Sequence, residues 1–197
     1  MDPRAVRVAR LAFLAFLALY GVALLRAPGA GSLLDSVDLP IHETGHLVFA
    51  PFGEVMGFLG GTLFQLILPG AFVAHFLWRG DRYGAAVCLW WVAQNCWNIS
   101  VYVADARAQE LPLVGGGEHD WAYLLDAAGW LSQDLAIARA VHGTGVLIFL
   151  FALAMGYRAA RSALPSPEGD DRGRIDQRAS INDAWRRTSE PESRPES

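Results

Sequence analysis

The sequence contains no lysine, and all 16 of its basic residues are arginine. Charged residues make up only 18% of the 197 positions, and the formal net charge is −4. A chain with so little positive charge excludes a nucleic-acid-binding role, because that role needs a basic surface against the phosphates. The exclusive use of arginine is typical of GC-rich coding and indicates a bacterial source.

Cysteine is almost as scarce. The two cysteines, Cys88 and Cys96, lie eight residues apart within one apolar segment and form no C-x-x-C pair. This spacing excludes a disulfide framework and a cysteine-based zinc site, and it predicts two buried free thiols.

Hydrophobic residues are abundant, at 53% of the chain. The mean hydropathy is +0.24 although the last 36 residues are polar. This combination predicts an integral membrane protein whose main partner is the lipid bilayer. We expect a membrane-embedded helical domain over residues 1–161. Residues 162–197 are rich in Pro, Ser, Glu, Asp and Arg, and they predict a disordered polar tail.

Four long apolar segments predict the fold class. They predict an all-α, polytopic membrane helix bundle with about four transmembrane helices. The first segment has a basic flank, but it is long for a signal peptide and is followed directly by Arg26, which favours an uncleaved helix. The four predicted transmembrane segments are 5–26, 53–78, 82–104 and 134–158.

A short segment between the first two apolar segments carries His42-Glu43-Thr44-Gly45-His46, which is an H-E-x-x-H motif. On a helix, His42 and His46 lie on one face and can bind a single metal ion, for which Zn²⁺ is the expected identity. Glu43 lies beside them and can act as general base toward a metal-bound water. We expect a helix over about 38–50, with Asp38 as its N-cap and Pro40 in its first turn. Such a helix is too short to cross a bilayer and is expected to be re-entrant or interfacial.

Arginine positions predict the orientation. With four transmembrane helices, both termini are cytoplasmic and the metal site lies toward the extracytoplasmic side of the cell (inner) membrane. If residues 36–51 crossed the membrane as a fifth helix, four arginines would move outside, against the positive-inside rule. These are Arg79, Arg82, Arg158 and Arg161.

A catalytic zinc ion usually has three protein ligands, so one more is needed. His119 is the first choice, with Glu118 or Asp120 holding the other N–H of its ring. Asp105 is the rival, and Glu118 and Asp120 stay open as ligands in their own right. Asp105 ends a row of polar residues on one helix face, which predicts either a hydrogen-bond ladder between helices or the wall of a wet cavity. The other members of the row are Gln94, Asn98 and Tyr102.

Glycines open the second long apolar segment. Gly53, Gly57 and Gly61 follow one another at intervals of four residues, with Gly60 beside the last. This spacing predicts close packing of this helix against a neighbour. Such packing would hold the metal-binding helix in place.

The H-E-x-x-H motif followed by Gly60-Gly61 in an apolar helix resembles the site-2-protease class of membrane zinc metallopeptidases. The resemblance implies His42 and His46 as ligands, Glu43 as the base and a distant aspartate as third ligand. In that class the aspartate lies in an Asn-x-x-Pro-x-Pro-x-Leu-Asp-Gly type of motif, whereas residues 98–106 contain neither the prolines nor the glycine. Residues 98–106 and 116–121 are also similar to a group of small uncharacterised bacterial membrane proteins.

The expected function is therefore a membrane-embedded zinc metallopeptidase acting on a membrane-associated peptide or protein. Two alternatives stay open. One is a non-enzymatic metal-binding membrane protein, such as a sensor, a metal-handling factor or a structural subunit. The other is a zinc hydrolase of a lipid or a small amide, which a roomy apolar cavity open to the bilayer would favour.

Overall fold

The computed structural model describes residues 2–27, 31–112 and 118–162. These residues form helices without any strand, which agrees with the predicted all-α class. The predicted tail beyond Ser162 lies outside the described residues. The α-helices are α1 (Pro3–Arg26), α2 (Asp35–Phe49), α3 (Glu54–Trp78), α4 (Arg82–Ala104), α5 (Asp120–Ala127) and α6 (Asp134–Ser162), with short 3-10 helices at Ala50–Phe52 and Leu131–Gln133.

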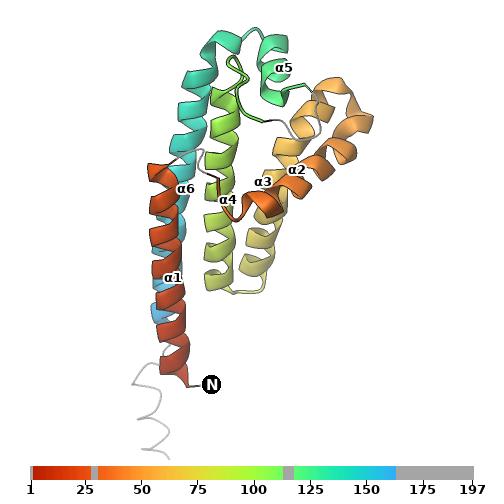
Figure 1. Cartoon of the computed structure of the whole chain (residues 1–197). Helices are drawn as coiled ribbons and strands as arrows, with labels where there is room; N and C mark the ends of the chain where they lie inside the picture. The colour runs from red at the N-terminus through yellow and green to blue at the C-terminus, as the bar shows by residue number, and fades with distance from the viewer. Residues whose placement is uncertain (1, 28–30, 113–117, 163–197) are drawn as a thin grey trace, which may run out of the picture. The chain divides into compact units, whose positions relative to one another are not determined.

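Three helical segments are long and apolar enough to cross a membrane, namely α1, α3 and Leu131–Ser162. The fourth predicted transmembrane segment, α4, is not among them. The polar residues of α4 fit its position, because α4 lies between the other long helices and buries these side chains against them (Figure 1). Gln94, Asn95 and Ser100 are all at most 5% exposed.

The core joins α4 to α1 and α6. Leu17, Trp90 and Phe149 come from these three helices and are buried in one cluster with Ala93, Trp97 and Ala152. The indole Nε1 of Trp90 donates a hydrogen bond to the Leu17 carbonyl oxygen, at 3.0 Å. The buried indole N–H of Trp90 therefore has a hydrogen-bond acceptor within the apolar core, as buried indoles usually do.

Helix α2 begins three residues earlier than predicted. It starts at Asp35, so Asp38 is a buried residue inside the helix rather than its N-cap, and Pro40 lies in the second turn. The carboxylate of Asp35 instead binds the preceding loop, accepting from the Ser32 N–H at 2.6 Å and the Ser32 hydroxyl at 2.9 Å. The predicted end is confirmed, because α2 stops at Phe49, just before Pro51.

Glycines bring α2 and α3 into close contact. A β-carbon at Gly60 would stand 2.5 Å from the Gly45 carbonyl oxygen, so both positions require glycine. In the predicted glycine series, Gly61 also lies in this tight interface. A β-carbon added at Gly57 would meet its nearest neighbouring atom only at 3.7 Å, which is an ordinary contact. Gly53 lies before α3 with φ 109° and has no such atom within 4 Å. Close packing of the motif helix therefore depends on Gly45, Gly60 and Gly61.

Candidate metal centre

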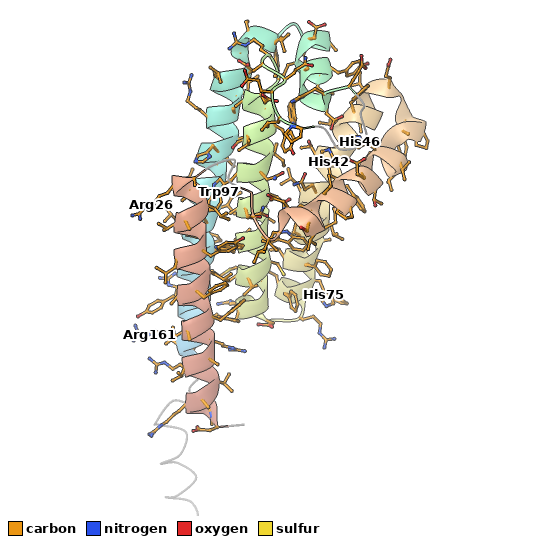
Figure 2. The ribbon with its side chains drawn as sticks, viewed as in Figure 1. Arg26, His42, His46, His75, Trp97 and Arg161 are labelled. Carbon is orange, nitrogen blue, oxygen red and sulfur yellow. The ribbon has the colours of Figure 1, made fainter. Side chains whose placement is uncertain are left out.

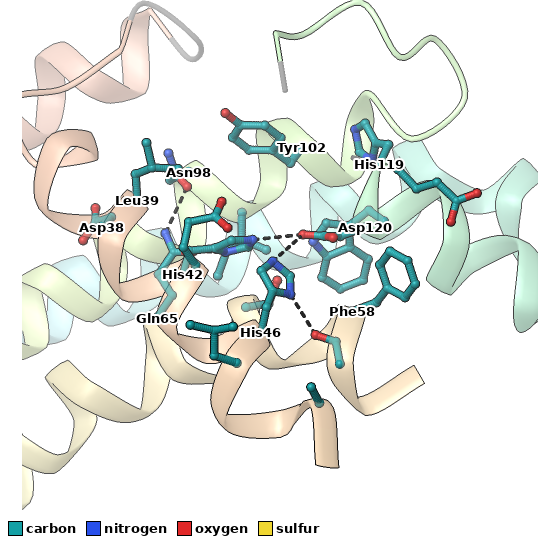
Figure 3. A pocket seen from close by; sticks show the side chains of 18 of the residues that line it. Asp38, Leu39, His42, His46, Phe58, Gln65, Asn98, Tyr102, His119 and Asp120 are labelled. Carbon is teal, nitrogen blue, oxygen red and sulfur yellow. Dashed lines mark hydrogen bonds and ion pairs between the residues drawn. The ribbon is translucent and has the colours of Figure 1, made fainter. Parts of the chain in front are cut away.

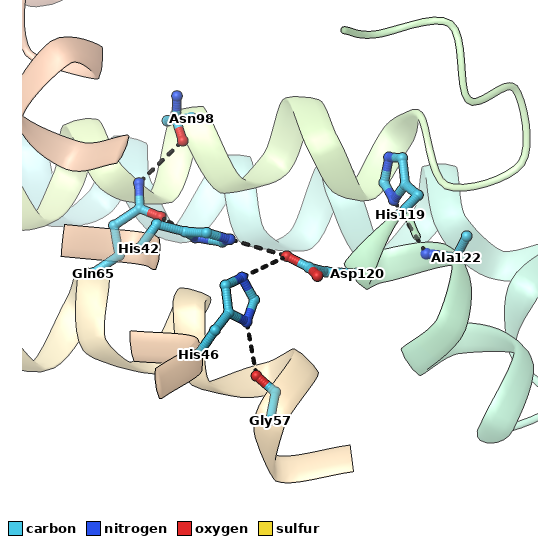
Figure 4. Close-up of polar contacts among 8 residues, drawn as sticks. All are labelled: His42, His46, Gly57, Gln65, Asn98, His119, Asp120 and Ala122. Atoms are coloured by element: carbon cyan, nitrogen blue, oxygen red, sulfur yellow. Dashed lines mark hydrogen bonds and ion pairs between the residues drawn. The ribbon is translucent and has the colours of Figure 1, made fainter. Parts of the chain in front are cut away.

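The two motif histidines meet a carboxylate from a distant helix. His42 and His46 project from α2 toward Asp120, the first residue of α5 (Figure 4). Nε2 of His42 is 2.9 Å from Oδ2 of Asp120, and Nε2 of His46 is 3.3 Å from the same oxygen. The three ligand atoms of this group lie within 4.8 Å of one another, so the group can hold a metal ion.

The opposite nitrogen of each imidazole has its own acceptor. Nδ1 of His46 lies 2.7 Å from the Gly57 carbonyl oxygen, and Nδ1 of His42 lies 3.1 Å from Oε1 of Gln65. A carbonyl oxygen only accepts hydrogen bonds, so each Nδ1 carries a proton. In the neutral form of each ring, Nε2 then keeps a lone pair that faces Asp120.

This arrangement favours a cation at the centre. Without one, two imidazole lone pairs would face a carboxylate oxygen, which only accepts hydrogen bonds. Ligands around a tetrahedral zinc ion with bonds of about 2.0–2.1 Å stand roughly 3.3 Å apart. The Nε2–Oδ2 distances to Asp120 are 3.3 Å from His46 and 2.9 Å from His42, so the second pair would separate slightly around an ion. The residues therefore fit a metal ion. The surroundings of His42 also raise its pKa: burial alone would lower it, but the hydrogen bonds with Asp120 and Gln65 outweigh burial.

His119 and Asp105, both expected as ligands, form a separate pair. Nδ1 of His119 accepts from the Ala122 N–H at 3.3 Å and so caps the start of α5, while its Nε2 lies 3.4 Å from Oδ2 of Asp105. The Asp105 carboxylate also accepts from the backbone N–H groups of Glu110 and Leu111, at 3.0 and 3.1 Å. The structure thus places Asp120 with His42 and His46, and it does not bring His119 or Asp105 into that group.

The centre opens into a cavity of about 740 Å³ (Figure 3). Glu43, the predicted base, lines this cavity together with His42 and His46. Six carboxylate side chains lie along its wall, and none of the described lining residues is an arginine. The six are Asp35, Asp38, Glu43, Glu54, Glu118 and Asp120.

Other polar side chains divide between this cavity and other parts of the fold. Asn98 and Tyr102, from the polar row of α4, line the cavity. Figure 2 shows His75 near the end of α3 far from the motif histidines, and its side chain is exposed. His142 lies outside the group, with Nδ1 at 3.5 Å from the Ser100 hydroxyl.

The polar row on α4 is both a ladder and a cavity wall. Asn98 donates from Nδ2 to Oδ1 of Asp35 at 3.2 Å and accepts at Oδ1 from Nε2 of Gln65 at 3.0 Å. Both interpretations that the sequence left open therefore apply to Asn98.

Comparisons with protein-family models, with curated proteins and with solved structures gave no match.

Proposed function

We propose that the chain is a membrane-embedded zinc-dependent metallopeptidase. His42, His46 and Asp120 would hold the zinc ion. The observation that carries this proposal is the meeting of both H-E-x-x-H imidazoles with one Asp120 oxygen, in a cavity that Glu43 also lines. Two histidines and one carboxylate leave a fourth zinc position open, as catalytic zinc sites require.

The side chains around the centre have distinct roles in this reaction. When bound, zinc would supply a Lewis acid that polarises the scissile carbonyl and lowers the pKa of a coordinated water. Glu43 takes a proton from the attacking water on its carboxylate and returns it to the leaving amine. The Tyr102 hydroxyl lines the same cavity and is a candidate donor for the substrate oxyanion, as is the second N–H of the Asn98 amide, whose first N–H binds Asp35.

With Asp120 as third ligand, the proposed site has the same types of metal ligand that the resemblance to site-2 proteases implies. That class uses two histidines and a distant aspartate. In this chain the carboxylate beside the histidines is Asp120, whereas Asp105 accepts hydrogen bonds from its own loop. Asp120 therefore replaces the predicted His119 and Asp105 in the proposed site.

Four membrane crossings, by α1, α3, α4 and α6, fit this function. Helices α3 and α4 run in opposite directions and are joined by the short turn at 79–81, so a crossing by α3 requires α4 to cross back (Figure 1). Helix α2 would then be re-entrant beside α3. The arginine distribution supports cytoplasmic termini in a cell (inner) membrane, with the metal centre toward the extracytoplasmic side.

The charge of the cavity favours a peptide over the lipid alternative. Burial raises the pKa of Asp38, and Asp120 would be bound to zinc. The other four acidic side chains of the wall repel the phosphate of a phospholipid head group, whereas a peptide can present neutral or cationic groups. The volume of about 740 Å³ lies in the usual range of small-molecule and peptide-segment sites. A peptide bond of a membrane-associated protein is therefore the proposed substrate.

Glu43→Gln is the test of catalysis. The variant keeps the size of the side chain but removes the base, so it should retain zinc and lose peptide hydrolysis against a library of membrane-associated peptides. Glu54→Gln is the matched control, because Glu54 lines the same cavity at the start of the next helix. Undiminished hydrolysis by Glu43→Gln would contradict the mechanism. A wild type that binds zinc and hydrolyses no peptide in the library would instead favour the non-enzymatic alternative.

A further inference from the structure

A continuous row of hydrogen bonds runs from the metal centre to the start of α2. Nδ1 of His42 lies 3.1 Å from Oε1 of Gln65, and Nε2 of Gln65 donates to Oδ1 of Asn98 at 3.0 Å. Nδ2 of Asn98 then donates to Oδ1 of Asp35 at 3.2 Å. The row joins three helices and ends on a carboxylate that the metal centre does not use.

The chemistry of the last member fixes the direction of every bond in the row. A carboxylate only accepts, so Asn98 must turn its NH₂ group toward Asp35 and its carbonyl oxygen toward Gln65. Gln65 must then turn its NH₂ group toward Asn98 and its carbonyl oxygen toward His42. The one remaining arrangement places a proton of His42 on Nδ1. In the neutral ring, Nε2 then keeps the lone pair that a metal ion needs, 2.9 Å from Oδ2 of Asp120.

Burial makes the orientation of Gln65 costly to change. Gln65 is 3% exposed, so little water can reach its amide to replace the bonds that a reversal would break. Reversal would also oppose NH₂ to the protonated Nδ1 of His42 and carbonyl oxygen to the Asn98 oxygen. The amide is therefore locked from both ends.

We infer that Gln65 is a positioning residue for the metal centre: held by Asn98 and Asp35, it selects the tautomer and orientation of His42 that bind the ion. This inference rests on the proposed function in so far as that function requires a metal ion at His42, His46 and Asp120. It adds a role for three polar residues that do not touch the ion. Hydrogen-bond partners of metal-binding histidines commonly change metal affinity by about 10–100-fold when they are removed.

The test compares zinc affinity in detergent-solubilised wild type, Gln65→Leu and Gln65→Glu, measured by competition with a chelator at one pH. Gln65→Leu removes the acceptor, and we expect its affinity to fall by about 10–100-fold. Gln65→Glu keeps an oxygen acceptor for Nδ1 but loses the NH₂ group that donates to Asn98, so its affinity should lie between those of Gln65→Leu and wild type. Asn95→Leu is the matched control, because it removes another buried amide, one that donates to the Trp91 carbonyl.

A spectroscopic signature separates positioning from a merely structural role. In the zinc-loaded protein with ¹⁵N-labelled histidine, the Nδ1–H proton of His42 should be protected from exchange in wild type and in Gln65→Glu. It should lose this protection in Gln65→Leu. Wild-type affinity together with a protected Nδ1–H in Gln65→Leu would overturn this inference alone. A wild type that binds no zinc would overturn the proposed function as well.

Discussion

The imidazole of His42 lies against the backbone of α3 at Gly61. A β-carbon added at Gly61 would stand 2.5 Å from Nε2 of His42, the nitrogen that faces Asp120. No non-hydrogen atom fits at that distance. The imidazole ring can therefore occupy this position only because residue 61 is glycine. The close contact between α2 and α3 thus fixes the position of a proposed ligand as well as that of a helix.

Gly61→Ala should therefore weaken zinc binding by roughly tenfold or more, because overpacking displaces the ring. The measurement is zinc affinity by competition with a chelator. Gly57→Ala is the matched control in the same helix, since its new β-carbon would lie 3.7 Å from the nearest foreign atom and would leave the Gly57 carbonyl in place for His46. Equal affinities of the two variants would contradict the role of Gly61.

Helix α2, which carries both motif histidines, was predictable from the sequence because its signal is local. The spacing of His42 and His46 matches one helical turn, and Pro51 marks the end of the helix. The start was predicted wrongly, because Asp38 is a suitable N-cap by residue type alone. Tertiary contacts bury it inside the helix instead, where its carboxylate accepts from the Trp91 indole N–H at 2.8 Å.

The third member of the group could not be chosen from the sequence. His119 and Asp120 are neighbours, and neighbouring residues near a helix start point in different directions. His119 caps α5 through Nδ1, a role more often filled by Ser, Thr, Asp or Asn, and this leaves Asp120 in the first turn to face α2. The position of α5 depends on the packing of the whole bundle, for which no local pattern exists.

The raised pKa of His42 predicts how zinc binding depends on pH. Because its pKa is raised, His42 in the metal-free fold keeps its proton to a higher pH than an ordinary histidine, whose pKa is about 6.5. The stability from this proton is present at low pH and is lost as the pH rises through the folded-state pKa. Zinc competes with the same proton, so its binding should strengthen over that range. The rise in melting temperature on adding zinc should be larger at about pH 8 than at about pH 6. An equal or smaller rise in melting temperature at the higher pH would contradict this competition between zinc and the proton.

The carboxylates of the cavity predict a preference among substrates. Peptides with Arg or Lys near the scissile bond should be cleaved with a higher kcat/KM than otherwise identical peptides with Asp or Glu there, because the wall carries four acidic side chains besides the zinc ligand Asp120 and the buried Asp38. The difference should shrink as salt is added, since salt screens partly exposed charges. Faster cleavage of the acidic peptides would show that the charge of the wall does not govern substrate choice.

Zinc content of the purified protein, measured by elemental analysis, tests the central claim most directly. Wild type should carry about one zinc ion per chain, because catalytic sites hold one ion with three protein ligands. His46→Ala and Asp120→Ala should lose it. His119→Ala and Asp105→Ala should keep most of it, since these residues form their own pair beside α5. A wild type without zinc, even after reconstitution, would contradict the account, and loss of zinc in His119→Ala with retention in Asp120→Ala would contradict the assignment of the third ligand.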